Sequence, residues 1–203
     1  MPFTTGGEYP TEHLFDAATI ARLKPHQILI NSSRGAVVEG RSLKAALKSK
    51  KIKAAVLDVY ENEPEPDCEL LDLLDIATPH IAGYSADGKA CGTQMSVRYI
   101  ARQFGLPLGN WSPEGIPEPE GGLQFAIDAA GREDQEILAR AILHTYNVEE
   151  DSQKLKAAPE KFESLRENYP VRREPTAYTI QLSGATDAVA AKLKQSGFKV
   201  CKI

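Results

Sequence analysis

Three polar residues of this chain could together carry out acid–base chemistry on a small hydroxy acid. Arg34 lies in the segment S-S-R-G, Glu63 in D-V-Y-E-N-E-P and His80 in P-H-I-A-G-Y, and each segment follows a short apolar run. A carboxylate beside an imidazole favours the protonated ring and fixes its tautomer. Arginine binds carboxylates through paired hydrogen bonds. These residue types suit reversible hydride removal from a 2-hydroxy acid, in which histidine takes the hydroxyl proton and arginine orients the acid.

The apolar runs before these residues predict strands of a parallel sheet. The expected strands are Gln27–Asn31, Ala54–Val59 and Asp75–Thr78, and the expected helices are Glu12–Leu23, Leu43–Lys48 and Leu70–Leu74. Strands that alternate with helices indicate βαβ units, whose ligands bind at the carboxyl ends of the strands. Because Arg34, Glu63 and His80 each follow a strand, we expect them at one edge of the sheet.

Beyond Ser85 the pattern changes to a long helix, a linker and a smaller α+β block. The expected elements are helices at Ala86–Phe104, Glu133–Tyr146, Lys161–Asn168 and Ala185–Gln195, and strands at Leu123–Ala129, Tyr178–Leu182 and Phe198–Ile203. Residues 106–122 are rich in glycine and proline, which is typical of a linker. The sequence therefore predicts an α/β fold in three parts: residues 1–85 with the reactive residues, a returning helix and linker at 86–112, and an α+β domain at 113–203.

Composition excludes several classes of protein. Of 203 residues, 42% are hydrophobic and 26% charged, which argues against a disordered chain. No apolar run is long enough to span a membrane, and the net charge of −4 argues against nucleic-acid or anionic-membrane partners. The three cysteines form no C-x-x-C, and the start carries no secretory pattern, so we expect a reduced, cytoplasmic compartment. No H-E-x-x-H or H-x-x-E-H occurs, so no metal site is predicted.

Three segments, LINSSRGAVVEG, LDVYENEP and TPHIAGYSADGKACGT, resemble the second half of the nucleotide-binding domain of D-2-hydroxyacid dehydrogenases. The resemblance implies a doubly wound, NAD-binding parallel sheet, with the catalytic arginine, glutamate and histidine at Arg34, Glu63 and His80. It also implies NAD as cofactor, with contacts at Ser32, Ser33, Arg34, Asp58 and Gly83, and Asp58 near the carboxamide. Tyr84 is expected to contact the substrate.

Two further segments resemble one branch of that family. These are HIAGYS with the following G-K-x-x-G-T, and F-E-x-L-R-E-N-Y-P-V-R-R-E near the C-terminus. The resemblance implies NAD-dependent oxidation of 4-phospho-D-erythronate to the 2-oxo acid, a step towards pyridoxal phosphate. It also implies a homodimer joined through residues 113–203.

A phosphorylated substrate needs a cationic group to hold the phosphate. Arg166, Arg172 and Arg173 form a basic cluster in an otherwise acidic chain, and arginine suits phosphate. We hypothesise that this cluster reaches the active site of the other subunit. The alternative is a solvated surface on which the arginines pair with neighbouring glutamates.

One expected feature of a nucleotide-binding sheet is missing. None of the fifteen glycines fits G-x-G-x-x-G, the motif that holds the pyrophosphate. We therefore expect the chain to be the carboxyl part of a longer enzyme, without turnover on its own and with an unpaired strand edge and an exposed apolar face. Two alternatives stay open: a phosphoglycerate-type D-2-hydroxyacid dehydrogenase, and a non-catalytic dimerisation or nucleotide-sensing module.

Overall fold

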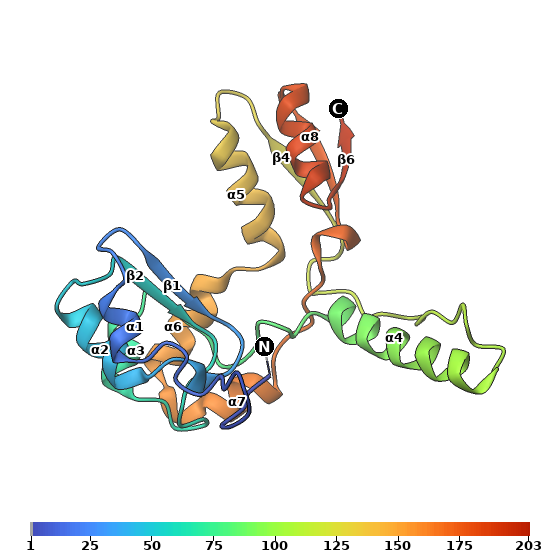
Figure 1. Cartoon of the computed structure of the whole chain (residues 1–203). Coiled ribbons are helices and arrows are strands. Elements are labelled where there is room, and N and C mark those ends of the chain that lie inside the picture. The colour runs from blue at the N-terminus through green and yellow to red at the C-terminus, as the bar shows by residue number, and fades with distance from the viewer. Residues whose placement is uncertain (1) are drawn as a thin grey trace. The chain divides into compact units, whose positions relative to one another are not determined.

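The computed structural model describes residues 2–203, which form two compact units (Figure 1). The first unit runs to Ala82 and also contains Val148–Tyr169. The second consists of Gly83–Asn147 and Pro170–Ile203. Each unit is built around its own parallel sheet, and each is described by itself.

A three-stranded parallel sheet forms the centre of the first unit. Its strands are β1 (Ile28–Asn31), β2 (Ala54–Leu57) and β3 (Ile76–Ala77), and its connections contain η1 (Gly35–Val37), α2 (Gly40–Lys48) and α3 (Cys68–Leu73). In the register, Leu29 lies opposite Ala55 and Val56 opposite Ile76. The α/β class and the parallel sheet are therefore as predicted. Because all three strands run the same way, their carboxyl ends lie at one edge.

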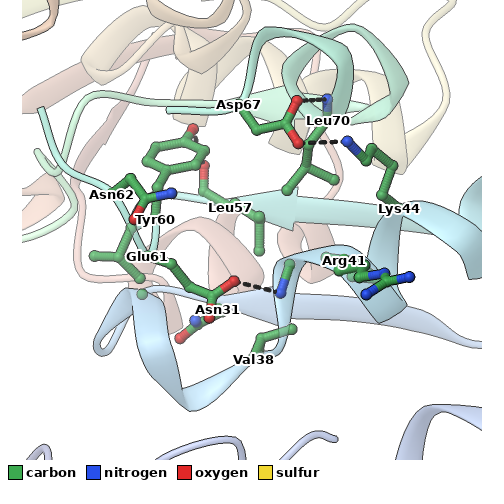
Figure 2. Close-up of a pocket in the computed structure, with 14 residues that line it drawn as sticks. Asn31, Val38, Arg41, Lys44, Leu57, Tyr60, Glu61, Asn62, Asp67 and Leu70 are labelled. Carbon is green, nitrogen blue, oxygen red and sulfur yellow. Dashed lines mark hydrogen bonds and ion pairs between the residues drawn. The ribbon is translucent and has the colours of Figure 1, made fainter. Parts of the chain in front are cut away.

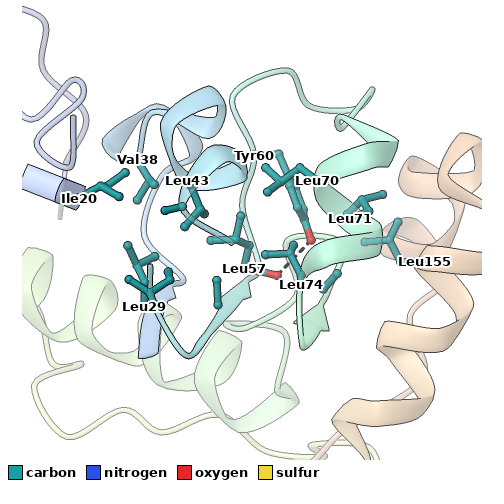
Figure 3. Packing of buried hydrophobic residues seen from close by; sticks show 14 of the residues in the cluster. Ile20, Leu29, Val38, Leu43, Leu57, Tyr60, Leu70, Leu71, Leu74 and Leu155 are labelled. Atoms are coloured by element: carbon teal, nitrogen blue, oxygen red, sulfur yellow. Dashed lines mark hydrogen bonds between the residues drawn. The ribbon is translucent and has the colours of Figure 1, made fainter. Parts of the chain in front are cut away.

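The helices pack on this sheet through leucine-rich faces. Leu43 and Ala46, three residues apart on one face of α2, are buried, whereas Lys44 and Lys48 make ion pairs on another face. Leu71 of α3 is 1% exposed. Figure 3 shows Leu43, Leu57 and Leu71 converging in this core. The core fixes the strand ends from which the reactive residues project.

The helix expected at Glu12–Leu23 is shorter in the structure. α1 covers only Ala17–Ala21, and the Asp16 side chain caps it by accepting the Thr19 amide. Residues 12–14 form a turn before α1, and Phe15 forms a parallel bridge with Val38. Backbone pairing with residues 36–38 replaces the first turns of the predicted helix.

A helix that the sequence did not predict covers the edge of the sheet at β3. α6 (Val148–Ala157) is followed by η2 (Pro159–Lys161) and α7 (Phe162–Glu167). Ser152 Oγ accepts the Ala77 amide at 3.0 Å, and Leu155 and Phe162 are buried in the core of the first unit. Residues 148–169 thus belong to the first unit, which corrects the prediction that they are part of an α+β domain spanning 113–203.

The second unit contains α4 and another three-stranded parallel sheet. The elements are α4 (Ala86–Phe104), β4 (Gln124–Asp128), α5 (Asp134–Thr145), η3 (Pro175–Ala177), β5 (Thr179–Ser183), α8 (Asp187–Gln195) and β6 (Lys199–Lys202), with strand order β4-β5-β6. Ile180, Leu182 and Leu193 are fully buried between the sheet and its helices. α4 has the predicted bounds and ends at Gly105, whose φ of +62° glycine adopts readily. Within residues 2–203, no helix is long and apolar enough to cross a bilayer.

Strand β1 lies at the end of the first sheet and exposes apolar side chains. Ile28 and Ile30 are 51% and 69% exposed, whereas Leu29 and Asn31 between and beside them are buried. The alternation places both isoleucines on one face of the sheet. The expected unpaired edge and exposed apolar face are therefore present in the described part of the chain.

Candidate active site

Glu63 and His80 meet beyond the carboxyl ends of the first sheet. His80 Nδ1 lies 2.7 Å from Glu63 Oε2, and the Tyr60 amide donates to Glu63 Oε1 at 2.9 Å. An ionised carboxylate only accepts hydrogen bonds, so the ring carries its proton on Nδ1 and presents Nε2 for proton exchange. The side chains of His80 and Glu63 are 30% and 23% exposed. Hydrogen bonds thus hold the pair, and both side chains remain partly accessible to a small molecule.

Tyr60 anchors the loop that carries Glu63. This loop, residues 58–67, joins β2 to α3. Its Tyr60 hydroxyl lies 3.0 Å from the Leu57 carbonyl and 3.2 Å from that of Thr78, and its ring packs edge-on against Phe162. Burial, together with the charges of Asp58 and Glu63, keeps the pKa of Tyr60 above its ordinary value, so the hydroxyl stays a neutral donor. The anchored ring fixes the backbone amide that holds Glu63.

Asp58 anchors the loop that carries His80. Its side chain is almost fully buried, and it accepts hydrogen bonds from Thr78 Oγ1 at 2.7 Å, the Ile81 amide at 2.8 Å and the Ala82 amide at 3.0 Å. His80 itself has a φ of +57°, in the left-handed region, and its amide donates to the Asp58 carbonyl at 2.8 Å. The expected contact of Asp58 with NAD stays a prediction. In the structure, the Asp58 carboxylate already accepts hydrogen bonds from the loop that carries His80.

Arg34, Ser32 and Ser33 follow β1 at the same edge. The Asn31 side chain organises this turn, because it donates to the Arg34 carbonyl and accepts from the Ser33 amide and hydroxyl. Arg34 and Ser32 are exposed. Within residues 2–203 no hydrogen bond or ion pair joins Arg34 to Glu63 or His80. Among the described residues, the Arg34 guanidinium donates a hydrogen bond only to the Ser33 carbonyl.

The other candidate residues have partners of their own. In the second unit, Lys89 Nζ lies 4.0 Å from the centre of the Tyr84 ring. The Arg172 guanidinium is buried and lies 4.1 Å from the centre of the Tyr146 ring. Gly83 also belongs to this unit, and a Cβ placed on it would meet nothing within 4 Å.

Arg173 makes a two-pronged ion pair that the sequence did not predict. Its Nε and Nη2 donate to the two oxygens of Asp87 at 2.9 and 3.0 Å. Arg166 lies in α7 of the first unit, whereas Arg172 and Arg173 lie in the second. The phosphate role of the three arginines stays a prediction, and in Arg173 two of the donors already bind Asp87.

The segment that contains Glu63 and His80 matches a known protein family. Residues 6–82 match the NAD binding domain of D-isomer specific 2-hydroxyacid dehydrogenases, and residues 124–197 match a domain of unknown function. The erythronate-4-phosphate dehydrogenase of Bacteroides thetaiotaomicron is 45% identical over 181 residues, covering 89% of this chain and 49% of that protein. The enzyme of the same name from Hahella chejuensis is 37% identical over 207 residues, covering 98% and 54%.

Solved structures overlap a smaller share of the chain. A D-isomer specific 2-hydroxyacid dehydrogenase from Xanthobacter autotrophicus, in complex with NADPH and MES, shares 34% identity over 53% of this chain and 43% of that chain, with a TM-score of 0.42.

These findings define the class of protein. Residues 6–82 match the NAD-binding domain of D-isomer specific 2-hydroxyacid dehydrogenases, which confirms the resemblance that the motifs indicated. Over nearly its whole length the chain is similar to the C-terminal part of erythronate-4-phosphate dehydrogenases. The chain spans about half the length of the curated relatives it matches.

Proposed function

We propose that the protein carrying this chain oxidises 4-phospho-D-erythronate to its 2-oxo acid with NAD, a step towards pyridoxal phosphate. The observation that carries the proposal is the 2.7 Å contact between Glu63 and His80 at the carboxyl edge of a sheet in the family-matched segment. The shared name of the curated relatives supports the choice of substrate.

The acid–base steps follow from the orientation of His80. Nε2 of His80 takes the proton of the C2 hydroxyl as the C2–O bond becomes a carbonyl. Glu63 accepts from Nδ1 and stabilises the imidazolium that forms. The exposed Arg34 guanidinium binds the substrate carboxylate and sets the orientation of C2. In the reverse direction, the same imidazolium returns its proton to the carbonyl oxygen.

The residues at this edge fit the nicotinamide end of the cofactor. NAD bound at this edge would supply the acceptor for the hydride that leaves C2. Ser32, which is exposed after β1, would contact the cofactor, and the proposed contact at Gly83 rests on the family resemblance alone. Asp58 fits a supporting role better, because its buried oxygens bind the His80 loop. The chain offers no G-x-G-x-x-G for the pyrophosphate.

The test compares variants of two histidines. It uses the protein as its source makes it, and the intact mass of that protein is first compared with the 22.2 kDa of this chain. His80→Asn retains a residue that tolerates a positive φ. We expect kcat for 4-phosphoerythronate to fall by roughly 10²- to 10⁴-fold with little change in NAD affinity. His26→Asn is the control, because His26 is exposed and makes no hydrogen bond or ion pair within residues 2–203. An unchanged kcat in His80→Asn contradicts the proposal.

The same assay separates the two alternatives. A higher kcat/KM with 3-phosphoglycerate than with 4-phosphoerythronate indicates a phosphoglycerate-type enzyme. NAD binding without turnover of either acid indicates a non-catalytic module, which the missing glycine motif favours for these 203 residues taken alone.

We also propose that the second unit contributes to a homodimer. Ala126, Gln181 and Cys201 are register neighbours across β4, β5 and β6, and all three are exposed. Parallel sheets are normally covered on both faces, so this face suits a second copy of the chain. Gln181→Arg should shift the protein towards monomer in light scattering. A molar mass equal to that of the unaltered protein contradicts dimerisation through this face.

A further inference from the structure

The carboxylate of a second histidine–carboxylate pair lies on the same loop as Glu63. Glu61 Oε1 lies 2.6 Å from His13 Nε2, and Glu61 Oε2 accepts the Gly40 amide at 2.7 Å. Both oxygens of Glu61 are thus engaged, as both oxygens of Glu63 are. The proposed reaction uses neither Glu61 nor His13.

Both partners of Glu61 belong to segments outside the loop. Gly40 is the first residue of α2, which the buried Leu43 fixes in the core, and a carboxylate is favoured at a helix N-terminus. His13 has a φ of +47°, and its amide donates to the Ala36 carbonyl at 2.7 Å. Glu61 therefore ties loop 58–67 to two independent parts of the first unit.

The groups around His13 favour its protonated ring. The hydrogen bond with Glu61 raises the pKa of His13 above its ordinary value. Partial burial opposes this shift, and the charges of Glu61, Glu39 and Glu12 add to it. On the Gly40 side, Arg41, Lys44 and Asp67 line a cavity of about 200 Å³ next to Glu61 (Figure 2).

The tie at Glu61 lies next to the groups that orient Glu63. One residue before it, the Tyr60 amide holds Glu63 Oε1. Two residues after it, Glu63 Oε2 binds the His80 ring. The Tyr60 ring fixes one end of this stretch, and Glu61 is the side chain that fixes the outer part of the turn between the two groups.

We propose that Glu61, held by His13 and the Gly40 amide, is a positioning residue for the Glu63–His80 pair. Its consequence for turnover rests on the proposed dehydrogenase function, whereas its consequence for the pair itself does not. Loss of Glu61 frees the turn, lets the Tyr60 amide and Glu63 separate, and leaves the His80 ring less well oriented.

The experiment replaces Glu61 with Ala and, as the matched control, Glu65 with Ala. Glu65 is an exposed glutamate of the same loop whose side chain makes no hydrogen bond or ion pair within residues 2–203. The first readout is the downfield proton resonance of His80 Nδ1, which reports the hydrogen bond to Glu63. We expect it to weaken or disappear in Glu61→Ala and to persist in Glu65→Ala.

The second readout separates kcat from KM. Glu61→Ala should lower kcat about 10- to 100-fold with the KM for NAD nearly unchanged, because a small misplacement of reacting groups slows the chemical step. Glu61→Gln should recover most of the loss, since its amide can serve both partners. His13→Asn, which keeps a residue suited to positive φ, breaks the pair alone and covers the case in which Glu61→Ala does not fold.

The outcomes distinguish this proposal from the proposed function. A persistent His80 resonance in folded Glu61→Ala or His13→Asn overturns the positioning role. A wild-type protein without dehydrogenase activity overturns the proposed function, and the resonance still decides the role of Glu61.

Discussion

At the scale of single residues, Gly35 shows how closely the active-site segments approach one another. A Cβ on Gly35 would lie 1.8 Å from the Tyr60 carbonyl oxygen and 2.7 Å from the Glu61 amide nitrogen. Gly35→Ala must therefore displace the turn that orients Glu63. We expect a loss of about 1–3 kcal/mol in the free energy of unfolding, and a lower kcat.

The control is Gly92→Ala in the middle of α4, where a Cβ meets nothing within 4 Å. Alanine favours a helix over glycine, so this variant should be more stable by about 0.5–1 kcal/mol. Urea unfolding of both variants makes the comparison. Equal stability of Gly35→Ala and the unaltered protein would mean that the turn gives way without cost.

The sequence indicated the proposed reactive residues but not the residues that support them. Arg34, Glu63 and His80 stand in recognisable segments after apolar runs, so their place at one edge followed from the strand pattern. Nothing in the sequence pattern pairs His13 with Glu61. Their pairing spans 48 positions and depends on how the chain folds, so local spacing held no sign of it.

At the scale of elements, α6 shows the limit of periodicity. Its sequence, VEEDSQKLKA, has no apolar stripe, and only Ser152 and Leu155 are buried. The helix forms because β3 offers an amide to Ser152 and the core accepts Leu155. α4, by contrast, has a Ser85 cap and a Gly105 stop, both visible in the sequence, and its bounds were predicted correctly.

The Asp87–Arg173 pair joins the first turn of α4 to the segment before η3. Asp87 and Arg173 side chains are 22% and 11% exposed. Burial acts to raise the pKa of Asp87, but hydrogen bonds from Arg173 and the Glu174 amide hold it below its ordinary value. Asp87→Asn should lower the free energy of unfolding by about 2 kcal/mol at neutral pH.

The pH dependence of this loss follows from the lowered pKa of Asp87. The pair contributes fully above the pKa of the unfolded aspartate, about 4, and its contribution is lost as pH falls through the lower folded value. The difference between Asp87→Asn and the unaltered protein should therefore shrink below about pH 4. Asp187→Asn, which breaks the exposed pair with Lys202, should change stability little at any pH. Similar losses in both variants would show that the burial of Asp87 is irrelevant.

At the scale of the whole molecule, the fold class followed from the alternation of strands and helices, but the division into units did not. The chain leaves the first unit at Gly83 and returns to it at Val148. The unit that residues 148–169 join depends on where Leu155 and Phe162 are buried, and both lie in the core of the first unit. The glycine and proline content of residues 106–122 indicates a linker, but it does not indicate which unit the helices after it pack against.

The exposed edge at β1 leads to a prediction about association of the 203-residue chain. Ile30 is 69% exposed beside an unpaired strand edge, an arrangement that favours strand-to-strand association. Ile30→Lys should reduce the concentration-dependent mass measured by light scattering and change the free energy of unfolding by less than about 0.5 kcal/mol. Ile203→Lys adds the same charge at a residue that is 77% exposed and lies beyond β6, so it should leave association unchanged. Equal effects of the two variants would attribute the change to net charge, and an effect confined to Ile30→Lys would locate the contact at β1.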